Sequence, residues 1–400
     1  MITGLFWLST AVLTETYVVF PAVVLGRGRW RARPHLEGDI TPTVSVVVAA
    51  HDEVEVIEAK IRSVLDGDYP PDLLEVIVAS DGSTDGTEIA ADVGDGRVRV
   101  LTLGRVGKAQ ALNAATAAAT GEIVVFTDAN SHFAHSTLRH LVRGFADPEV
   151  GGVAGDQRYL PAGSAVTQSV TGHGETGYWD FDRALKLAES RSGNVIGATG
   201  ALYAVRRDLV EPLPDGVTDD FTTSTGVIAA GHRLVFATDA TVYEPVSASA
   251  GAEYRRKVRV MSRGLRAVAY RRALLNPARH GFYSYQLFNH KVLRRLMALP
   301  LLTLAVSSGA SLQRGWIYRV AFAAQAAIYV PGAIALACPK SRLGRSRPFG
   351  LAGYFCMVNA AGALAAWQVA TGQRINQWTP ERVEIPTTGP KVEPRPGRRA

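Results

Sequence analysis

Three short apolar runs, rich in β-branched residues, each lead into acidic side chains. The runs are residues 44–50, 74–79 and 123–127. The acids that follow them are Asp52 and Glu53, Asp81 and Asp85, and Asp128. Near-continuous apolar runs of this length are typical of strands buried on both faces of a parallel sheet. Because such sheets bind ligands at the carboxyl ends of their strands, the pattern predicts a nucleotide and metal site at one sheet edge.

The central part of the chain alternates expected strands with expected helices. Helical patterns occur at residues 54–65, 87–92 and 109–119, and a further strand is expected at 98–103. Short strand and helix units in alternation favour an α/β fold with a doubly wound, mostly parallel sheet. We therefore predict one α/β domain over residues 42–247.

Apolar residues concentrate toward the two ends of the chain, where they predict membrane-spanning helices. The whole chain is 47% hydrophobic, which is high for a purely soluble protein. Residues 1–26 hold one charged side chain, Glu15, and are long enough to cross a bilayer. The later apolar runs are residues 296–312, 316–338 and 349–370. We predict one N-terminal span and about three spans over residues 296–371, the alternative being buried core helices of a soluble protein.

Basic residues next to these runs predict the orientation of the chain in the membrane. Four arginines lie between residues 27 and 33, directly after the first run, whereas a signal peptide carries its positive charge before the apolar stretch. Residues 339–347 hold four basic residues and no acid. By the positive-inside rule both segments are cytoplasmic, which places the α/β domain at the cytoplasmic face of a bacterial plasma membrane. Residues 372–400 are expected to form a flexible tail.

A basic segment connects the predicted domain to the later apolar runs. Residues 253–295 hold twelve Lys and Arg against one acid, with arginines at helical spacing. No aromatic-rich binding motif accompanies these charges, so nucleic acid is not the expected partner. Basic amphipathic helices beside a membrane span favour the lipid interface, and we predict such interface helices over residues 252–295. The two cysteines, Cys338 and Cys356, form no disulfide framework or zinc motif.

Several short motifs indicate how a nucleotide would be held. Asp81 and Asp85 lie on a turn of Gly, Ser and Thr, which brings backbone amides close to a ligand. Lys108 begins an expected helix, where an ammonium group and helix amides both attract a diphosphate. Its surroundings do not match the P-loop spacing, and no dinucleotide-binding glycine motif follows the first strand. Asp128 and Asn130 have the spacing of a Mg²⁺ or Mn²⁺ site that is completed by substrate phosphates.

The order of these motifs resembles the membrane-embedded, inverting family 2 glycosyltransferases with a GT-A domain, a group that includes cellulose, hyaluronan and poly-N-acetylglucosamine synthases. The resemblance runs from about residue 44 to 372. It is carried by residues 49–53, 80–87, 107–113, 128–130, 197–206 and 218–221. It implies a Rossmann-like GT-A fold and an enzyme of polysaccharide or cell-envelope biosynthesis.

The resemblance also implies a role for each matching residue. Glu53 and Asp81 correspond to positions at the nucleotide base and ribose, Asp85 to the same donor-binding turn, and Lys108 to a position near the diphosphate. Asp128 and Asn130 stand where the family binds its metal.

On the acceptor side, Asp220 corresponds to the general base, with Asp219 beside it. A neighbouring carboxylate raises the pKa of such a base toward its working range. Direct attack by the acceptor hydroxyl on the α-linked sugar of the donor, which is expected to be a UDP-sugar, would form a β-linkage.

Two departures from the family pattern carry information. Asn130 replaces the second metal-binding aspartate, which weakens metal binding without abolishing it. The Gln-x-x-Arg-Trp motif of the synthases is matched here by Arg256 to Val260, which retains Arg259 but has no tryptophan to stack on an acceptor sugar. We therefore expect transfer of one or a few sugars to a lipid or glycan acceptor, with Arg256 and Arg259 near the diphosphate or acceptor. A processive synthase is the competing hypothesis.

The sequence alone leaves several roles open. Asp219 is either part of the site or a helix cap. The aromatic pair Tyr178 and Trp179 either stacks on an acceptor sugar or belongs to the core. A polyprenyl-phosphate glycosyltransferase would use the same donor chemistry without a strong base, and a non-catalytic membrane scaffold would retain only the fold. The donor sugar and any protein partners are undefined at this level.

Overall fold

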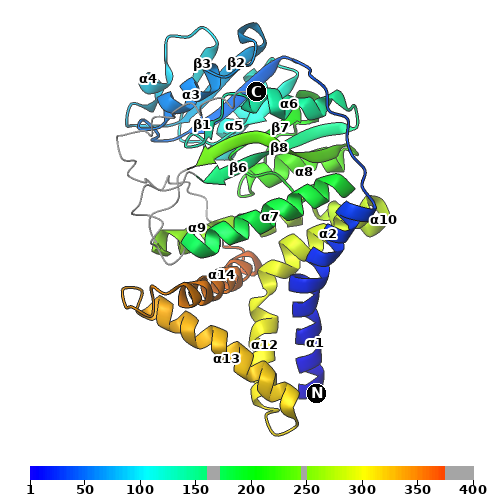
Figure 1. Cartoon of the computed structure of the whole chain (residues 1–400). Coiled ribbons are helices and arrows are strands. Elements are labelled where there is room, and N and C mark those ends of the chain that lie inside the picture. Colours follow the sequence, from blue (N-terminus) through cyan, green and yellow to red (C-terminus); the bar gives the residue numbers. More distant parts are fainter. Residues whose placement is uncertain (160–171, 245–249, 374–400) are drawn as a thin grey trace, which may run out of the picture.

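A mixed eight-stranded sheet forms the centre of the part of the chain that is described. The computed structural model describes residues 1–159, 172–244 and 250–373 (Figure 1). The strands are β1 Val44–Ala50, β2 Leu74–Asp81, β3 Val98–Leu103, β4 Ile123–Phe126, β5 His132–Phe133, β6 Val150–Tyr159, β7 Tyr203–Arg206 and β8 Arg233–Glu244. Their order across the sheet is β3-β2-β1-β4-β7-β6-β8-β5. The predicted α/β class is confirmed.

The first half of the sheet is parallel and brings the predicted acidic strand ends to one edge. Val47 of β1 is paired with Ile77 of β2 and with Phe126 of β4, in parallel on both sides. All seven residues of β1 are buried, and alternate residues belong to two different core clusters. Burial on both faces explains why the sequence of this strand is apolar throughout instead of alternating.

The second half of the sheet is less parallel than the sequence pattern predicts. β7 runs antiparallel to both β4 and β6, whereas β6 and β8 are parallel to each other. β7 is only four residues long and enters the sheet between strands that precede it in the chain. The direction of a strand depends on the path of the connection that leads to it. The short apolar sequence of β7 does not encode that path.

Helices cover both faces of the sheet (Figure 1). They are α3 Ile57–Leu65, α4 Thr87–Ala91, α5 Lys108–Ala118, α6 Thr137–Val142, α7 Gly172–Ser192 and α8 Asp219–Ala229. α3 begins three residues later than predicted because residues 51–56 form a turn. α5 buries Leu112 and the small side chains of Ala111 and Ala115 where it packs against β1 and β2.

Three described helices are long and apolar enough to cross a membrane, and a bent pair forms a fourth candidate. The N-terminal candidate, Ile2–Trp30, comprises α1 Ile2–Thr14, a π-helical turn Glu15–Val19 and α2 Phe20–Trp30. α13 Trp316–Ala337 and α14 Arg347–Ala370 correspond to the last two predicted runs. The bent pair joins residues Phe282–Leu296 to α12 Ala298–Gly309 at 57°. The described residues thus contain three or four candidate spans, and the predicted number, one N-terminal span and about three later ones, stays a prediction.

The first part of the basic segment forms α9 Ala250–Tyr270, which lies between the sheet domain and the apolar helices (Figure 1), whereas its last part, Phe282–Leu296, belongs to the bent pair. Val258, Ala267 and Val268 of α9 are buried. α14 packs along the length of α9: the Lys257 ammonium lies 5.7 Å from the Tyr354 ring, and Ser262 donates to Gln368 at 2.8 Å. In Figure 1, α14 runs across the molecule beneath α9, whereas α1 and α12 extend away from the domain. α14 therefore runs in roughly the same direction as α9, the helix that we predict to lie in the lipid interface.

Most of the predicted tail, residues 374–400, lies outside the described residues, as do the side chains of Tyr178 and Trp179.

Candidate active site

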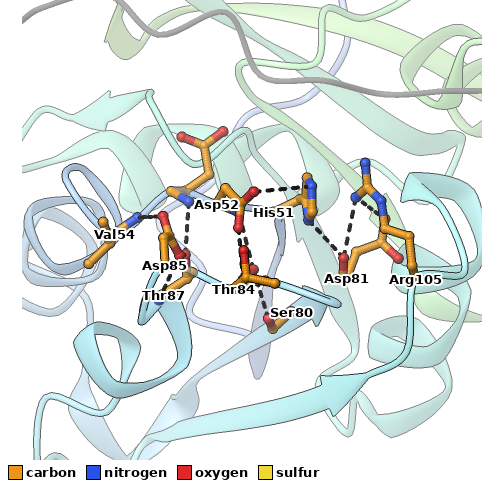
Figure 2. Close-up of polar contacts among 11 residues, drawn as sticks. His51, Asp52, Val54, Ser80, Asp81, Thr84, Asp85, Thr87 and Arg105 are labelled. Carbon is orange, nitrogen blue, oxygen red and sulfur yellow. Dashed lines mark hydrogen bonds and ion pairs between the residues drawn. The ribbon is translucent and has the colours of Figure 1, made fainter.

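Asp81 connects the end of β2 to the loop that precedes α5. Its side chain is fully buried, and Oδ1 accepts hydrogen bonds from the backbone N–H groups of Val106 and Gly107 at 2.7 and 2.8 Å. Oδ2 forms a 2.8 Å ion pair with Arg105 (Figure 2). In this state Asp81 orders the loop that leads to Lys108, and both of its oxygens have protein partners.

The turn at Asp85 is tied to the turn after β1. Asp85 Oδ1 accepts from the Thr87 backbone N–H and hydroxyl, and Oδ2 accepts from the Val54 backbone N–H at 3.2 Å (Figure 2). The Glu53 backbone N–H donates to the Thr87 hydroxyl at 2.8 Å. Burial by itself would raise the pKa of Asp85, but the hydrogen bonds that Asp85 accepts from Thr87 and Val54 outweigh burial and hold the pKa below its usual value. The two donor-side turns therefore form one braced unit.

His51, which the sequence does not single out, also belongs to this unit. Its Nδ1 lies 2.9 Å from the backbone oxygen of Asp81, and its Nε2 lies 3.4 Å from an Asp52 carboxylate oxygen (Figure 2). Asp52 has a φ of 53°, a conformation uncommon for a residue with a side chain. Its Oδ1 accepts from the Thr84 backbone N–H at 2.9 Å, so the strained turn is held across the two strand ends.

Lys108 joins the expected metal position to the expected catalytic pair. Its Nζ lies 2.8 Å from Asp128 Oδ1 and 3.0 Å from Asp219 Oδ2. Burial by itself would lower the pKa of Lys108, but the two carboxylates outweigh burial and raise the pKa above its ordinary value. Positions 108, 128 and 219, which are far apart in sequence, thus meet at one point.

Asp220 lies beside this ion-pair cluster, in the first turn of α8. Its Oδ1 accepts a hydrogen bond from the Phe221 backbone N–H at 2.7 Å. Burial, and after it the charge of Asp219, raise the pKa of Asp220 to about 6, against the opposing effects of Lys291 and Lys108. A carboxylate that titrates near neutral pH is suited to accept a proton from a hydroxyl.

The structure does not support a helix-cap role for Asp219. Thr218 occupies the N-cap position of α8, and Asp219 is the first helical residue. Its carboxylate is directed to Lys108 at 3.0 Å. Asp219 therefore belongs to the charged cluster, where the N-terminal end of the helix also favours a negative charge.

Asp128 and Asn130 present oxygen donors at the carboxyl end of β4. Asp128 is half-buried and Asn130 is exposed. Within the described residues no three His, Cys, Asp or Glu side chains converge as a metal cage. A carboxylate and an amide oxygen fit Mg²⁺ or Mn²⁺ when substrate phosphates complete the coordination. Gly200 lies against this site, because a Cβ added there would be 2.8 Å from Asp128 Oδ2.

The two arginines predicted from the partial synthase motif are placed differently from each other. Arg256 forms a 2.7 Å ion pair with Glu253 on its own helix, α9. Arg259 is half-buried one turn before Arg263; burial, and after it the charge of Arg259, lower the pKa of Arg263, while Asp219 acts in the opposite direction. The roles of Arg256 and Arg259 stay predictions, and Arg263 is a site neighbour that the motif match does not reveal.

A buried lysine beneath Asp128 is a further residue that the motifs do not reveal. Lys60 is fully buried, its Nζ donates to the Thr127 hydroxyl at 2.7 Å, and it lies 3.8 Å from the Phe133 ring centroid. Burial lowers the pKa of Lys60 well below its usual value, although Asp128 and Glu244 act in the opposite direction. One signal could have found it, because Lys60 has helical spacing with the apolar positions of α3.

Comparison with known proteins gives a consistent result. The family described as "Glycosyltransferase like family 2" matches residues 42–264. An N-acetylglucosaminyltransferase of Rhizobium meliloti (strain 1021) is 29% identical over 225 residues, 50% of this chain and 50% of that protein. A beta-monoglucosyldiacylglycerol synthase of Synechocystis sp. is 35% identical over 130 residues, 30% of this chain and 27% of that protein. The chain spans about half the length of the first curated relatives it matches.

A solved structure resembles nearly the whole chain. The mannosyltransferase PcManGT from Pyrobaculum calidifontis, in complex with GDP-Man and Mn²⁺, has a TM-score of 0.70 and 26% sequence identity. The similarity covers 92% of this chain and 100% of that one. It therefore includes the apolar helices as well as the sheet domain.

Proposed function

This chain belongs to glycosyltransferase family 2, and on that premise we propose that it transfers a sugar from a nucleotide-sugar to an acceptor hydroxyl at a membrane surface. The observation that carries the proposal is the contact of Lys108 with both Asp128 and Asp219. A donor-side carboxylate and an acceptor-side carboxylate meet at one ammonium group, so one bound sugar can face both.

The donor side consists of the braced turns and the Lys108 loop. Glu53, Asp81 and Asp85 belong to the part that holds the nucleoside, and Lys108 attracts the diphosphate. A divalent ion, Mg²⁺ or Mn²⁺, would be held by Asp128 and Asn130, and when bound it would stabilise charge on the departing diphosphate. PcManGT, which was solved with GDP-Man and Mn²⁺, supports a nucleotide-sugar and a metal here. We propose a UDP-sugar donor, with GDP-sugars as the competing class.

The acceptor side is centred on Asp220. The acceptor oxygen forms a bond to the anomeric carbon while the bond from that carbon to the diphosphate oxygen breaks, and Asp220 takes the hydroxyl proton. Lys108, together with Arg256 and Arg259 if they lie near the diphosphate as predicted, stabilises the negative charge of the leaving nucleoside diphosphate. One displacement inverts the anomeric centre, so an α-linked donor forms a β-linked product.

The membrane helices and the altered synthase motif support a lipid or glycan acceptor and transfer of one or a few sugars. Val260 replaces the tryptophan of the synthase motif, which removes an aromatic platform for a growing chain. The arginines after the first apolar run support a cytoplasmic location for the active domain. This combination suits a role in cell-envelope or exopolysaccharide synthesis.

A donor screen on the purified full chain tests the proposal. Release of nucleoside diphosphate is measured with UDP- and GDP-sugars, with Mg²⁺, Mn²⁺ or EDTA present. We expect release with one donor class, and EDTA should suppress it. The absence of release with every donor, by protein that is folded and binds metal, would overturn the proposal and favour a non-catalytic scaffold.

A further inference from the structure

Cations occur on two separate helical segments that follow α8 in the chain. Arg263 comes from α9, which contacts α8, the helix that begins with Asp219. Lys291 comes from a π-helical turn, Phe288–Val292, and its ammonium lies 5.6 Å from the ring centroid of Phe221, the residue after Asp220. Both side chains are half-buried. The two cations form a positive region, in which the Asp182 carboxylate, 3.7 Å from His290, also acts on Lys291.

Arg295 extends this positive region toward the membrane. It lies four residues after Lys291 and three residues before α12 begins. A Cβ added to Gly264 of α9 would lie 2.5 to 2.8 Å from the Arg295 guanidinium, so the guanidinium rests directly on the backbone of α9. A Cβ added to Gly362 of α14 would lie 2.7 Å from the Arg295 carbonyl oxygen. Gly264 and Gly362 thus leave the space in which Arg295 packs between α9 and α14.

We propose that Arg263, Lys291 and Arg295 form a binding site for the phosphate of a lipid-linked acceptor. The inference rests on the proposed function and names its acceptor class: a lipid whose hydroxylated headgroup is attached through a phosphate. The headgroup hydroxyl meets Asp220, and the phosphate lies on the cations at the start of α12. Arginine forks bind phosphate oxygens in pairs, which a neutral glycolipid headgroup does not exploit.

The position of Asp220 decides between two uses of phosphate. An acceptor phosphate that itself attacked the sugar would already be ionised and would need no base. A half-buried carboxylate beside the expected sugar position instead indicates a hydroxyl nucleophile. The phosphate therefore anchors the acceptor and is not the attacking group.

The experiment compares acceptors with the full chain in lipid nanodiscs, after the donor has been identified. Transfer of labelled sugar is measured to phosphatidylinositol, to monoglucosyldiacylglycerol and to polyprenyl phosphate, with inorganic phosphate as a competitor. We expect transfer to the phosphate-linked, hydroxylated lipid. Equal use of the neutral glycolipid, or preference for polyprenyl phosphate, would overturn the proposal. Inhibition by inorganic phosphate without any lipid preference would assign the cations to a soluble anion and would also overturn it.

Gly264→Ala provides a sharp variant because it displaces the Arg295 guanidinium without removing a charge. Alanine is a better helix former than glycine, so a functional loss would not come from a weakened α9. We expect Gly264→Ala and Arg295→Gln to raise the acceptor KM by about tenfold or more, the size of one charged hydrogen bond, and to change the donor KM much less.

Two matched controls accompany these variants. Gly4→Ala is a glycine-to-alanine change in a different helix, α1, where the added Cβ meets nothing within 4 Å. Arg255→Gln removes an exposed charge from α9. Unchanged acceptor KM in both Gly264→Ala and Arg295→Gln would overturn the site. If wild-type protein released no nucleoside diphosphate from any donor, the proposed function would fail first, and the two failures are thereby distinguished.

Discussion

At the scale of single residues, the site depends on charges that are held close together. The single ammonium group of Lys108 pairs with both Asp128 and Asp219, while Asp220 keeps a raised pKa because it is partly buried and lies beside Asp219. The adjacent carboxylates therefore differ in function: one is engaged in an ion pair and the other can accept a proton. This division matches the roles proposed for the two consecutive aspartates, one as ion-pair partner and the other as base.

Replacing Asp220 by asparagine tests whether this carboxylate acts as the base, because asparagine cannot accept the hydroxyl proton. Turnover of the wild type should rise with pH through about 6, as Asp220 loses its proton. Asp220→Asn should reduce turnover by about a hundredfold or more, since general bases contribute that much. Initial rates from pH 5 to 8 check this, with Asp239→Asn on the exposed part of β8 as control.

The same variant has a defined effect on thermal stability. A carboxyl group whose pKa is raised by folding holds its proton longer in the folded protein, so wild-type stability falls as pH rises from about 4 to 6. Asp220→Asn lacks this loss and should have a higher unfolding midpoint at pH 8, with the difference shrinking toward pH 4. Equal midpoints at pH 8 would contradict the burial of this carboxylate.

Gly200 tests the placement of Asp128 without changing any charge. A Cβ at this position would lie 2.8 Å from Asp128 Oδ2. We expect Gly200→Ala to turn the carboxylate away from its position and to lower turnover by about tenfold or more, because small misplacements of catalytic groups are costly. The half-maximal Mn²⁺ concentration should rise with it. Gly96→Ala, with open space around the added Cβ, is the matched control.

At the scale of elements, buried polar side chains connect helices to the sheet beneath the site. Lys60 of α3 reaches Thr127 at the end of β4, and the Thr127 hydroxyl donates to the Ala201 carbonyl oxygen at 2.7 Å. These two hydrogen bonds thus join α3, the end of β4 and the loop after residue 200. A buried ammonium group with a lowered pKa destabilises the fold wherever it must be protonated.

Lys60→Met should therefore stabilise the protein. Because folding lowers the pKa of Lys60, the unfolded chain binds more protons over the range between the two pKa values, and wild-type stability rises with pH there. Methionine fills similar space without this penalty, so its unfolding midpoint should be higher at pH 7 and approach that of the wild type above pH 10. Scanning fluorimetry across pH checks this, with Lys340→Met at an exposed position as control. A lower midpoint at pH 7 would show that the Thr127 bond outweighs burial.

At the scale of the whole molecule, the domain sits on an assembly of apolar helices through α9. α9 contacts α8 of the domain and packs along α14, so the part of the site formed by α8 faces the apolar helices. The donor turns lie at the other end of the domain, near α3 and α4 (Figure 1). This arrangement suits a water-soluble donor and an acceptor that arrives from the membrane.

The orientation predicts which side of the membrane exposes Cys338. This cysteine is exposed at the end of α13, next to the basic residues 339–347, whereas Cys356 is less exposed. In a Cys356→Ala background, a membrane-impermeant maleimide should label Cys338 in inside-out vesicles and not in intact cells. Cys338→Ser serves as the control for specific labelling. Labelling from outside intact cells would reverse the predicted topology.

Much of the parallel half of the sheet and its functional edge could be predicted from the chain. The strands at 44–50, 74–81 and 123–126 are apolar on both faces, and this pattern has few structural solutions. Asp81, Asp128 and Lys108 were singled out by local motifs, whereas Asp220 was singled out only by the family resemblance; their roles stay predictions. Local sequence was sufficient here because each feature depends on neighbours within one strand–turn–helix unit.

Only the tertiary structure decided how these units combine. The direction of β7, the burial of Lys60, the approach of Arg263, Lys291 and Arg295, and the course of α14 along α9 all depend on contacts between segments far apart in sequence. Such contacts depend on which surfaces fit together after the elements have formed. The sequence by itself therefore determined the fold class and the type of chemistry, whereas long-range packing determined which charges meet at the acceptor side.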